Sequence, residues 1–179
     1  MNTSANSGLA ARARVVRLLI LDVDGVLTDG GLQFDNHGEE YKTFNSLDGH
    51  GIRMLLDNAI EVAVITGRES KIVSHRMSDL GVKHVYQGCR DKLSAFEELL
   101  QATGLKPELA AYVGDDLPDL PIMQRVGLAI AVNNAHAFVK QHCDWVTSVS
   151  GGKGAVREVT DLILESQSLL EARQQQYLK

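Results

Sequence analysis

The feature that most constrains this fold is a series of short apolar runs separated by longer stretches with helical periodicity. The runs are rich in valine, isoleucine and leucine, as in buried strands. They cover residues 15–23, 60–65, 83–86, 110–113 and 128–132, and one lies around Trp145. Strands that alternate with helices favour a parallel sheet with helices on both faces. The sequence therefore predicts a doubly wound, Rossmann-like α/β fold.

Several helix boundaries are also predicted. Asp48 can cap a helix whose apolar positions continue to Ala59, and Gly81 ends a helix that begins near Glu69. The last helix begins near Lys153 and runs through Leu164.

One β-hairpin is expected within this alternation. Residues 31–34 and 39–44 flank Asp35-Asn36-His37-Gly38, a cluster of turn-forming residues. The side chains of this protruding hairpin are apolar enough to form an interface, but they could equally pack on their own domain. They are Leu32, Phe34, Tyr41 and Phe44. We expect a single domain over residues 15–168, a flexible start over 1–14 and a polar tail over 169–179.

Composition limits the class of protein. The chain has 179 residues, of which 44% are hydrophobic, and a net charge of −5, which suits one globular domain and argues against nucleic-acid binding. The apolar stretch after Arg17 is too short for a signal peptide, and no stretch is long enough to span a membrane. Cys89 and Cys143 fit no disulfide framework or zinc pattern, so we expect buried thiols in the reducing cytoplasm.

Charged and polar side chains follow four of the predicted strands. In a doubly wound sheet, ligands bind beyond the carboxyl ends of the strands, so these side chains are candidates for one site. They are Asp22 and Asp24 after the first strand, Thr66, Gly67 and Arg68 after the second, Lys92 after the third, and Asp115, Asp116 and Asp119 after the fourth.

This set of residues suits phosphoryl chemistry. Asp22 and Asp115 can share a hard divalent cation, with the backbone carbonyl of Asp24 as a further ligand; Mg²⁺ suits such oxygen ligands, and Mn²⁺ remains an alternative. Thr66 and Lys92 would bind the outer phosphate oxygens. Asp22 could attack phosphorus to form an aspartyl-phosphate, while Asp24 would protonate the leaving oxygen and later deprotonate water.

Four motifs resemble those of the haloacid dehalogenase-like phosphohydrolases. They are "DVDGVLT" (22–28), "VITGR" (64–68), Lys92 and "GDDLPD" (114–119), in the order of that family. Each alone has a simpler interpretation, such as a solvated loop or a helix cap, but together they favour the family. Many members carry a cap domain that this chain has no room for, so another subunit is expected to cover the site.

Longer stretches resemble one capless, tetrameric branch of the family, the 3-deoxy-D-manno-octulosonate 8-phosphate phosphatases. These stretches are "FNSLDGHGIR" (44–53), "TGRES" (66–70), "YQGCRDK" (86–92) and "GGKGAVREV" (151–159). The resemblance implies that phosphate is released from an eight-carbon sugar acid, a precursor of bacterial lipopolysaccharide. It also implies a homotetramer with a central barrel of hairpins, and a tail at 169–179 that closes a neighbouring site.

The resemblance further implies a set of substrate contacts. Arg68 leads this set, because arginine binds carboxylate bidentately and related phosphatases of nine-carbon sugar acids have glutamate at this position. A nine-carbon substrate remains the alternative. The full set is Asp24, Asn45, Ser46, Leu47, Asp48, Gly49, Arg53, Gly67, Arg68, Arg76 and Lys92, with Asp116 and Asp119 in support.

Two other classes of function are weighed against the phosphatase. Response-regulator receivers also place acidic residues, a threonine and a lysine around magnesium, but their acceptor stands alone after a middle strand. A catalytically inactive tetramerisation module would not need every catalytic position filled. Turnover separates these classes, because a receiver retains its phosphate and an enzyme releases many equivalents.

Overall fold

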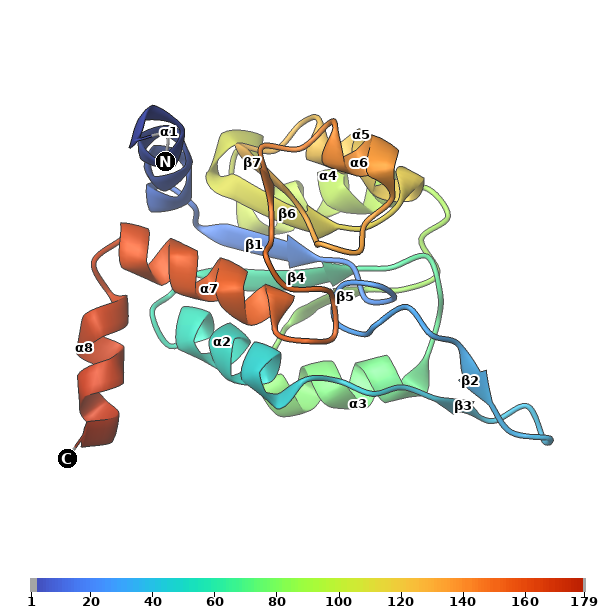
Figure 1. Ribbon diagram of the computed structural model, residues 1–179. Helices are drawn as coiled ribbons and strands as arrows, with labels where there is room; N and C mark the ends of the chain where they lie inside the picture. Colours follow the sequence, from blue (N-terminus) through green and yellow to red (C-terminus); the bar gives the residue numbers. More distant parts are fainter. Residues whose placement is uncertain (1–2, 179) are drawn as a thin grey trace.

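The chain forms a six-stranded sheet between two layers of helices (Figure 1). The computed structural model describes residues 3–178. The strands are β1 (Leu18–Leu21), β4 (Glu61–Ile65), β5 (His84–Tyr86), β6 (Ala110–Gly114), β7 (Leu128–Ala131) and β8 (Trp145–Val146). They lie in the order β5-β4-β1-β6-β7-β8, and all neighbours are parallel. The predicted doubly wound α/β fold is confirmed.

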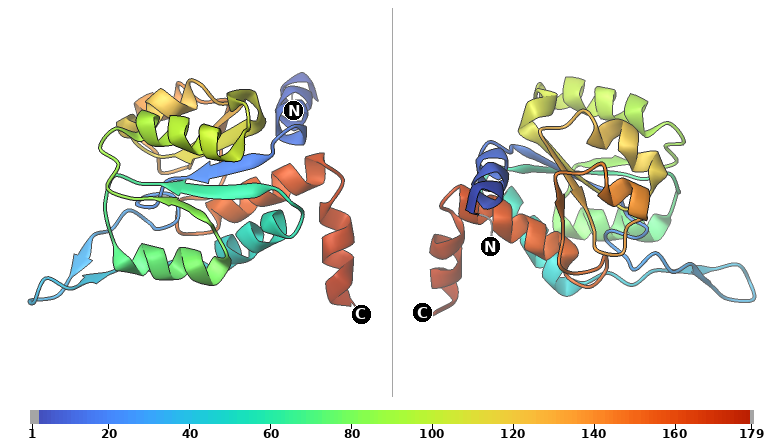
Figure 2. Two further views of the ribbon diagram at one scale, coloured as in Figure 1. Left: turned by 180° about the vertical axis from the view of Figure 1, so that it is seen from behind. Right: turned by 45° about the horizontal axis from the view of Figure 1, so that its top comes forward.

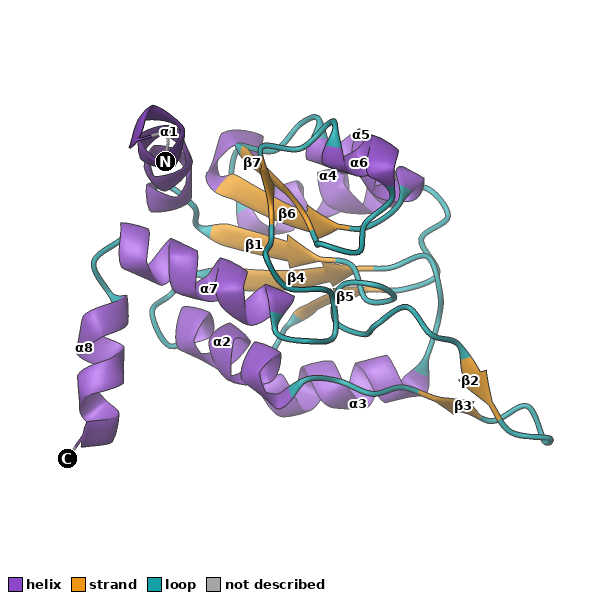
Figure 3. Ribbon diagram, in the orientation of Figure 1, coloured by secondary structure: helices purple, strands orange, loops and turns teal. Residues whose placement is uncertain are grey.

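The helices divide between the two faces of the sheet (Figures 2 and 3). One face carries α2 (Ser46–Leu56), α3 (Lys71–Leu80) and α7 (Ala155–Ser166). The other carries α4 (Lys92–Thr103), α5 (Leu120–Met123) and α6 (Ala137–Lys140). The connections change face because right-handed crossovers first run outward from β1 to β4 and β5, and then back to β6 and beyond.

The centre of the sheet shows why the apolar runs become strands. All four side chains of β1 are fully buried, because β1 pairs with both β4 and β6 and helices cover both of its faces. Strands are added to one side of β1 first and to its other side from β6 onward. A crevice for ligands opens at such a topological switch point, between β1 and β6. The loops after these two strands carry Asp22 and Asp115.

The predicted hairpin projects from the domain (Figure 1) and is shorter than expected. Its strands are β2 (Gln33–Phe34) and β3 (Glu40–Tyr41), which pair antiparallel. Asp35 Oδ1 accepts the backbone N–H groups of His37 and Glu39, and Gly38 turns the chain with φ +81°. Leu32, Phe34 and Tyr41 are about half exposed, and the Phe34 ring lies 5.9 Å from the Arg68 guanidinium carbon. Phe44 is instead partly buried and packs against the core of its own domain.

Both ends of the described chain are helical. Thr3–Arg14 forms helix α1, whose Ala13 is buried and whose Ala13 carbonyl accepts Gln167 Nε2–H. Local composition does not indicate this helix, because the contacts that hold α1 in place come from the far end of the chain. The tail forms α8 (Leu170–Gln175) and the 3₁₀ helix η3 (Gln176–Leu178). Residues 1–2 and 179 lie outside the described part of the chain.

Some predicted boundaries also change. The first strand begins at Leu18 rather than Val15, which is exposed after α1. Helix α2 is capped by Asn45 and not by Asp48. The last helix begins at Ala155, after Gly154 with φ +107°. Both cysteines are free thiols, although only half-buried. Within residues 3–178, no helix is both long and apolar enough to cross a membrane.

Candidate active site at the carboxyl edge of the sheet

A cavity of about 430 Å³ opens at the carboxyl ends of the central strands. It contains every residue that the sequence assigned to catalysis, together with Cys89, Arg90 and Pro118, which were not predicted. Its lining is Asp22, Asp24, Thr66, Gly67, Arg68, Cys89, Arg90, Lys92, Asp115, Asp116, Pro118 and Asp119. The motifs that are far apart in the sequence therefore meet in one place.

Four charged residues form the base of this cavity, and we call them the sheet-edge cluster: Asp22, Lys92, Asp115 and Asp119. Carboxylate oxygens of the three aspartates lie within 4.8 Å of one another. Lys92 Nζ lies 2.9 Å from Asp22 Oδ1 and 2.7 Å from Asp119 Oδ1. The Asp22 N–H donates to the Val113 carbonyl, which fixes Asp22 to the end of β6. The cluster thus places three acidic groups around a single ammonium.

The crowding of these carboxylates changes their acidity. Burial, with a smaller contribution from the Asp119 charge, raises the pKa of Asp22 from an ordinary value of 3.8 to about 6, although Lys92 opposes the shift. Burial and the charges of Asp22 and Asp119 raise the pKa of Asp115 to about 7. Burial lowers the pKa of Lys92, but Asp22 and Asp119 outweigh this, and its pKa is raised. The cluster is short of positive charge.

The geometry of the cluster fits a divalent cation. Asp22 Oδ1 is buried and has no hydrogen-bond partner among the described residues, because its contact with Lys92 is close but not aligned as a hydrogen bond. Gly25, with φ +99°, lies against Asp115, and a Cβ at this position would overlap Asp115 Oδ2. An unpartnered carboxylate oxygen beside two further carboxylates is a ligand set that suits a hard cation such as Mg²⁺.

Asp119 has less capacity left for a ligand. Its Oδ1 accepts bonds of 2.7 Å from Lys92 Nζ and Tyr112 Oη, and its Oδ2 accepts the N–H groups of Asp115 and Asp116. The supporting role expected for Asp119 stays a prediction. Tyr112 was not predicted, because it lies inside a buried strand and its sequence position indicates only core packing.

Thr66 is held at the end of β4. Its N–H donates to the Tyr86 carbonyl, its own carbonyl accepts the N–H of Cys89, and its side chain is buried against the cavity. The hydroxyl therefore has a fixed position next to the sheet-edge cluster.

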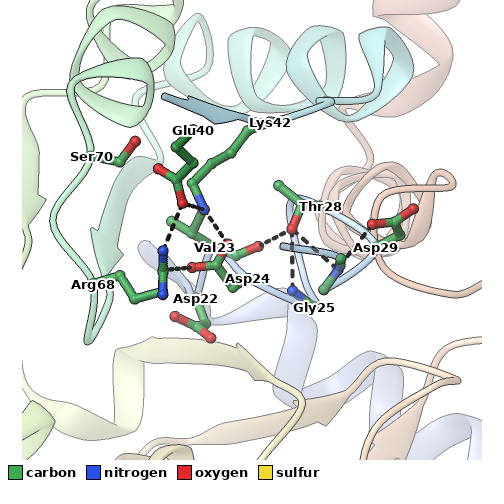
Figure 4. A network of polar contacts seen from close by, with 12 residues as sticks. Asp22, Val23, Asp24, Gly25, Thr28, Asp29, Glu40, Lys42, Arg68 and Ser70 are labelled. Carbon is green, nitrogen blue, oxygen red and sulfur yellow. Dashed lines mark hydrogen bonds and ion pairs between the residues drawn. The ribbon is translucent and has the colours of Figure 1, made fainter. Parts of the chain in front are cut away.

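A second charged group surrounds Asp24 (Figure 4) and shares Asp24 and Arg68 with the lining of the cavity. We call it the hairpin-base network: Asp24, Glu40, Lys42 and Arg68. Lys42 Nζ contacts Asp24 Oδ1 and lies 3.2 Å from Glu40 Oε1. Arg68 Nη2 donates to Glu40 Oε1 over 2.8 Å, and its Nε lies 3.5 Å from Asp24 Oδ2. Two cations and two anions therefore alternate around the network.

Glu40 and Lys42 were missed at the sequence level. Their spacing of two residues on a strand does predict that both lie on one face, opposite Tyr41. That signal does not say that this face meets Asp24, because the direction of the hairpin depends on the tertiary fold.

The predicted substrate contacts on and near α2 lie outside this cavity. Asn45 Oδ1 caps α2 through the N–H of Leu47, and Ser46 and Leu47 are exposed. Asp48 is buried, and its Oδ1 accepts the N–H of Arg157 at the start of α7.

The remaining predicted contacts of this region are also engaged elsewhere. Arg53 donates to the Leu80 carbonyl and pairs with Asp57. Gly49 lies against the guanidinium of Arg76. Of the predicted contacts, the cavity brings together Asp24, Gly67, Arg68 and Lys92, and it leaves Arg53, Arg76 and 45–49 apart.

Comparison with known proteins gives consistent matches. A sequence model of the haloacid dehalogenase-like hydrolase family matches residues 85–159. The 3-deoxy-D-manno-octulosonate 8-phosphate phosphatase KdsC of Escherichia coli K12 is 52% identical over 166 residues, which cover 93% of this chain and 88% of that protein.

Solved structures agree with the sequence matches. A 3-deoxy-D-manno-octulosonate 8-phosphate phosphatase from Yersinia pestis superposes with a TM-score of 0.91 at 51% identity, covering 92% of this chain and 89% of its own. The corresponding enzyme from Moraxella catarrhalis, in complex with a magnesium ion, a phosphate ion and a KDO molecule, gives 0.92 at 38% identity, with 94% and 97% covered. The chain belongs to the 3-deoxy-D-manno-octulosonate 8-phosphate phosphatase family of haloacid dehalogenase-like hydrolases.

Proposed function

We propose that this chain is a Mg²⁺-dependent phosphomonoesterase that hydrolyses 3-deoxy-D-manno-octulosonate 8-phosphate (KDO 8-phosphate) to KDO and inorganic phosphate. The observation that carries the proposal is the sheet-edge cluster, in which the nucleophile candidate Asp22 stands between Lys92 and the carboxylate of Asp115. The reaction belongs to the synthesis of lipopolysaccharide precursors, and we assign it to the cytoplasm.

The chemistry proceeds in two displacements on phosphorus. A carboxylate oxygen of Asp22 attacks phosphorus, the bond to the sugar oxygen breaks, and Asp24 donates a proton to that oxygen. Asp24 then removes a proton from water, whose oxygen attacks the aspartyl-phosphate and regenerates the Asp22 carboxylate. The Thr66 hydroxyl and the Lys92 ammonium bind the outer phosphate oxygens in both steps.

Magnesium would be held by the carboxylates of Asp22 and Asp115 and the backbone carbonyl of Asp24. When bound, it would neutralise charge on the phosphate oxygens and offset the repulsion between the acidic groups.

Recognition of the sugar acid is assigned first to Arg68. Its side chain is 42% exposed and lines the cavity, so its guanidinium can bind a carboxylate from the open side. The remaining members of the predicted set stay proposed as substrate contacts: Asn45, Ser46, Leu47, Asp48, Gly49, Arg53 and Arg76. Since they lie outside the cavity of their own chain, they would have to act on a substrate bound by another subunit.

We also propose a homotetramer assembled through the hairpins. Leu32, Phe34 and Tyr41 expose 54%, 52% and 52% of their surface on a segment that projects from the domain (Figure 2). The tail lies at the end of the sheet away from the hairpin (Figure 1), so a lid formed by residues 169–179 would serve a neighbouring site.

A panel of phosphorylated sugars and sugar acids tests this function. We expect metal-dependent release of many equivalents of phosphate, fastest from KDO 8-phosphate, and loss of release when a chelator removes the metal. Preference for a nine-carbon sugar acid phosphate would replace the assigned substrate. A single retained equivalent of phosphate per chain would favour a receiver-like module instead.

A further inference from the structure

Lys42 is a charged residue whose side chain is almost completely buried. The side chain is 2% exposed, and its ammonium contacts Asp24 Oδ1 and lies 3.2 Å from Glu40 Oε1. A buried ammonium is costly unless it is paired and hydrogen-bonded, and these two carboxylates supply the partners. Lys42 follows β3, so a residue of the hairpin reaches the second aspartate of the first motif (Figure 4).

The two oxygens of Asp24 are held in different ways. Arg68, which approaches Oδ2 at 3.5 Å, is 42% exposed and lines the cavity, so a substrate can draw it away. Lys42, which contacts Oδ1, has a side chain only 2% exposed and is absent from the cavity lining given by the described residues. The orientation of the Asp24 carboxylate therefore depends mainly on Lys42 once a substrate is bound.

Glu40 completes this arrangement by holding both cations. Burial raises its pKa, but hydrogen bonds from Ser70, Arg68 and Lys42 outweigh that effect, and the pKa is lowered. Glu40 therefore stays negatively charged and keeps the ammonium of Lys42 in place beside Asp24.

We propose that Lys42 is a positioning residue for Asp24, which fixes the carboxyl group where, in its protonated form, it can donate a proton to the leaving sugar oxygen. This inference rests on the proposed function, in which Asp24 is the general acid. The hairpin then contributes to the chemistry of its own chain, in addition to any contact it makes with other subunits. Lys42 itself does not touch the reacting atoms.

Two esters with different leaving groups test the inference. KDO 8-phosphate releases an alkoxide that needs a proton, whereas p-nitrophenyl phosphate releases a nitrophenolate that leaves without one. The ratio kcat/KM reports the steps up to phosphoryl transfer to Asp22, in which only the first ester needs the acid. With Mg²⁺ present, we expect Lys42→Met to lower kcat/KM about 10- to 100-fold for KDO 8-phosphate and less than about threefold for p-nitrophenyl phosphate.

Two further variants define the cause of the loss. Lys42→Arg keeps the positive charge and should recover most of kcat/KM for KDO 8-phosphate. Lys83→Met removes an exposed lysine before β5 and should leave both esters unaffected. Melting temperatures measured in parallel identify a variant that fails to fold. If Lys42→Met does not fold, Lys42→Arg provides the test. Its smaller loss of kcat/KM should occur with KDO 8-phosphate and not with p-nitrophenyl phosphate.

Equal losses on both esters, or no loss on either, would overturn the positioning role. If the wild type did not hydrolyse KDO 8-phosphate, the proposed substrate would be wrong instead. The same comparison between p-nitrophenyl phosphate and an alkyl phosphate that the wild type does hydrolyse would still test Lys42.

Discussion

The two charged groups at the site balance their charges in opposite ways. The sheet-edge cluster sets three carboxylates against the single ammonium of Lys92. The hairpin-base network sets the carboxylates of Asp24 and Glu40 against Lys42 and Arg68. The first group has less positive than negative charge, and within residues 3–178 a buried oxygen of Asp22 has no hydrogen-bond partner, whereas the second is balanced within one chain.

This difference separates two tasks within one cavity. A group that is short of positive charge is suited to a metal ion and a phosphate that arrive from outside. A balanced network is suited to holding side chains in fixed positions, since each charge already has a partner. The proposed nucleophile Asp22 belongs to the first group and the proposed acid Asp24 to the second, although only one residue separates them.

The largest effect is expected at Asp22 in the sheet-edge cluster. Asp22→Asn removes the nucleophile while keeping its shape, so phosphate release should fall by more than about 10³-fold. The fold should remain, because the substitution also relieves repulsion with Asp115 and Asp119. Phosphate release from KDO 8-phosphate and the circular dichroism spectrum check both statements. Undiminished release would remove Asp22 as the nucleophile.

Metal removal should lower the stability of the protein through the sheet-edge cluster, and the size of this effect should depend on pH. The pKa values of Asp22 and Asp115, about 6 and about 7, exceed the ordinary 3.8, so their contribution to stability is fully present below about pH 4. In the metal-free protein this contribution is lost as the pH rises through 6 and 7, where the carboxylates ionise in the folded state and repel one another.

Magnesium should therefore stabilise the protein more at pH 8 than at pH 5, where protons compete for the same oxygens. At a Mg²⁺ concentration about a hundredfold above the Kd at pH 8, we expect Tm to rise by about 5–10 °C at pH 8. At the same concentration, the rise at pH 5 should be less than half of that. Thermal unfolding with Mg²⁺ or a chelator measures the difference, and Asp115→Asn should abolish it. A shift that was equal at the two pH values would contradict the assigned ligands.

Arg68 is the member of the hairpin-base network that we propose to bind the carboxylate of the substrate. Arg68→Ala should lower kcat/KM for KDO 8-phosphate by about 10- to 100-fold, because a charge-assisted contact with the sugar carboxylate is lost. A small phosphate ester without a carboxylate should lose far less. Equal losses for the two esters would show that Arg68 does not recognise the carboxylate.

The sheet-edge cluster was predictable from the sequence because every member follows a strand that the apolar pattern reveals. Asp22, Lys92 and Asp115 converge as a consequence of parallel topology, which alternation of strands and helices already indicates. Tyr112 escaped prediction because a buried tyrosine in a strand has the same pattern whether or not its hydroxyl binds an acid.

The hairpin-base network was only half predictable. Asp24 and Arg68 belong to motifs, but Glu40 and Lys42 come from a hairpin whose direction depends on its packing and not on local periodicity. At Asp48 the sequence predicted the wrong contact. A carboxylate near a helix start suits a cap of its own helix, but the fold brings it instead to the N-terminus of α7, through the N–H of Arg157.

The smallest effect is expected at Glu40, and it distinguishes a fixed network from one that opens for the substrate. Glu40 Oε1 accepts from Arg68 Nη2, so Glu40 competes with a sugar carboxylate for that guanidinium. Glu40→Gln removes the competing charge, and KM for KDO 8-phosphate should fall by about two- to fivefold. KM for p-nitrophenyl phosphate, which has no carboxylate, serves as the control and should not change. A higher KM for KDO 8-phosphate would mean that Glu40 holds Arg68 in the position where it binds the sugar carboxylate. The intact hairpin-base network, with the contact between Glu40 and Arg68 in place, would then be part of the recognition site.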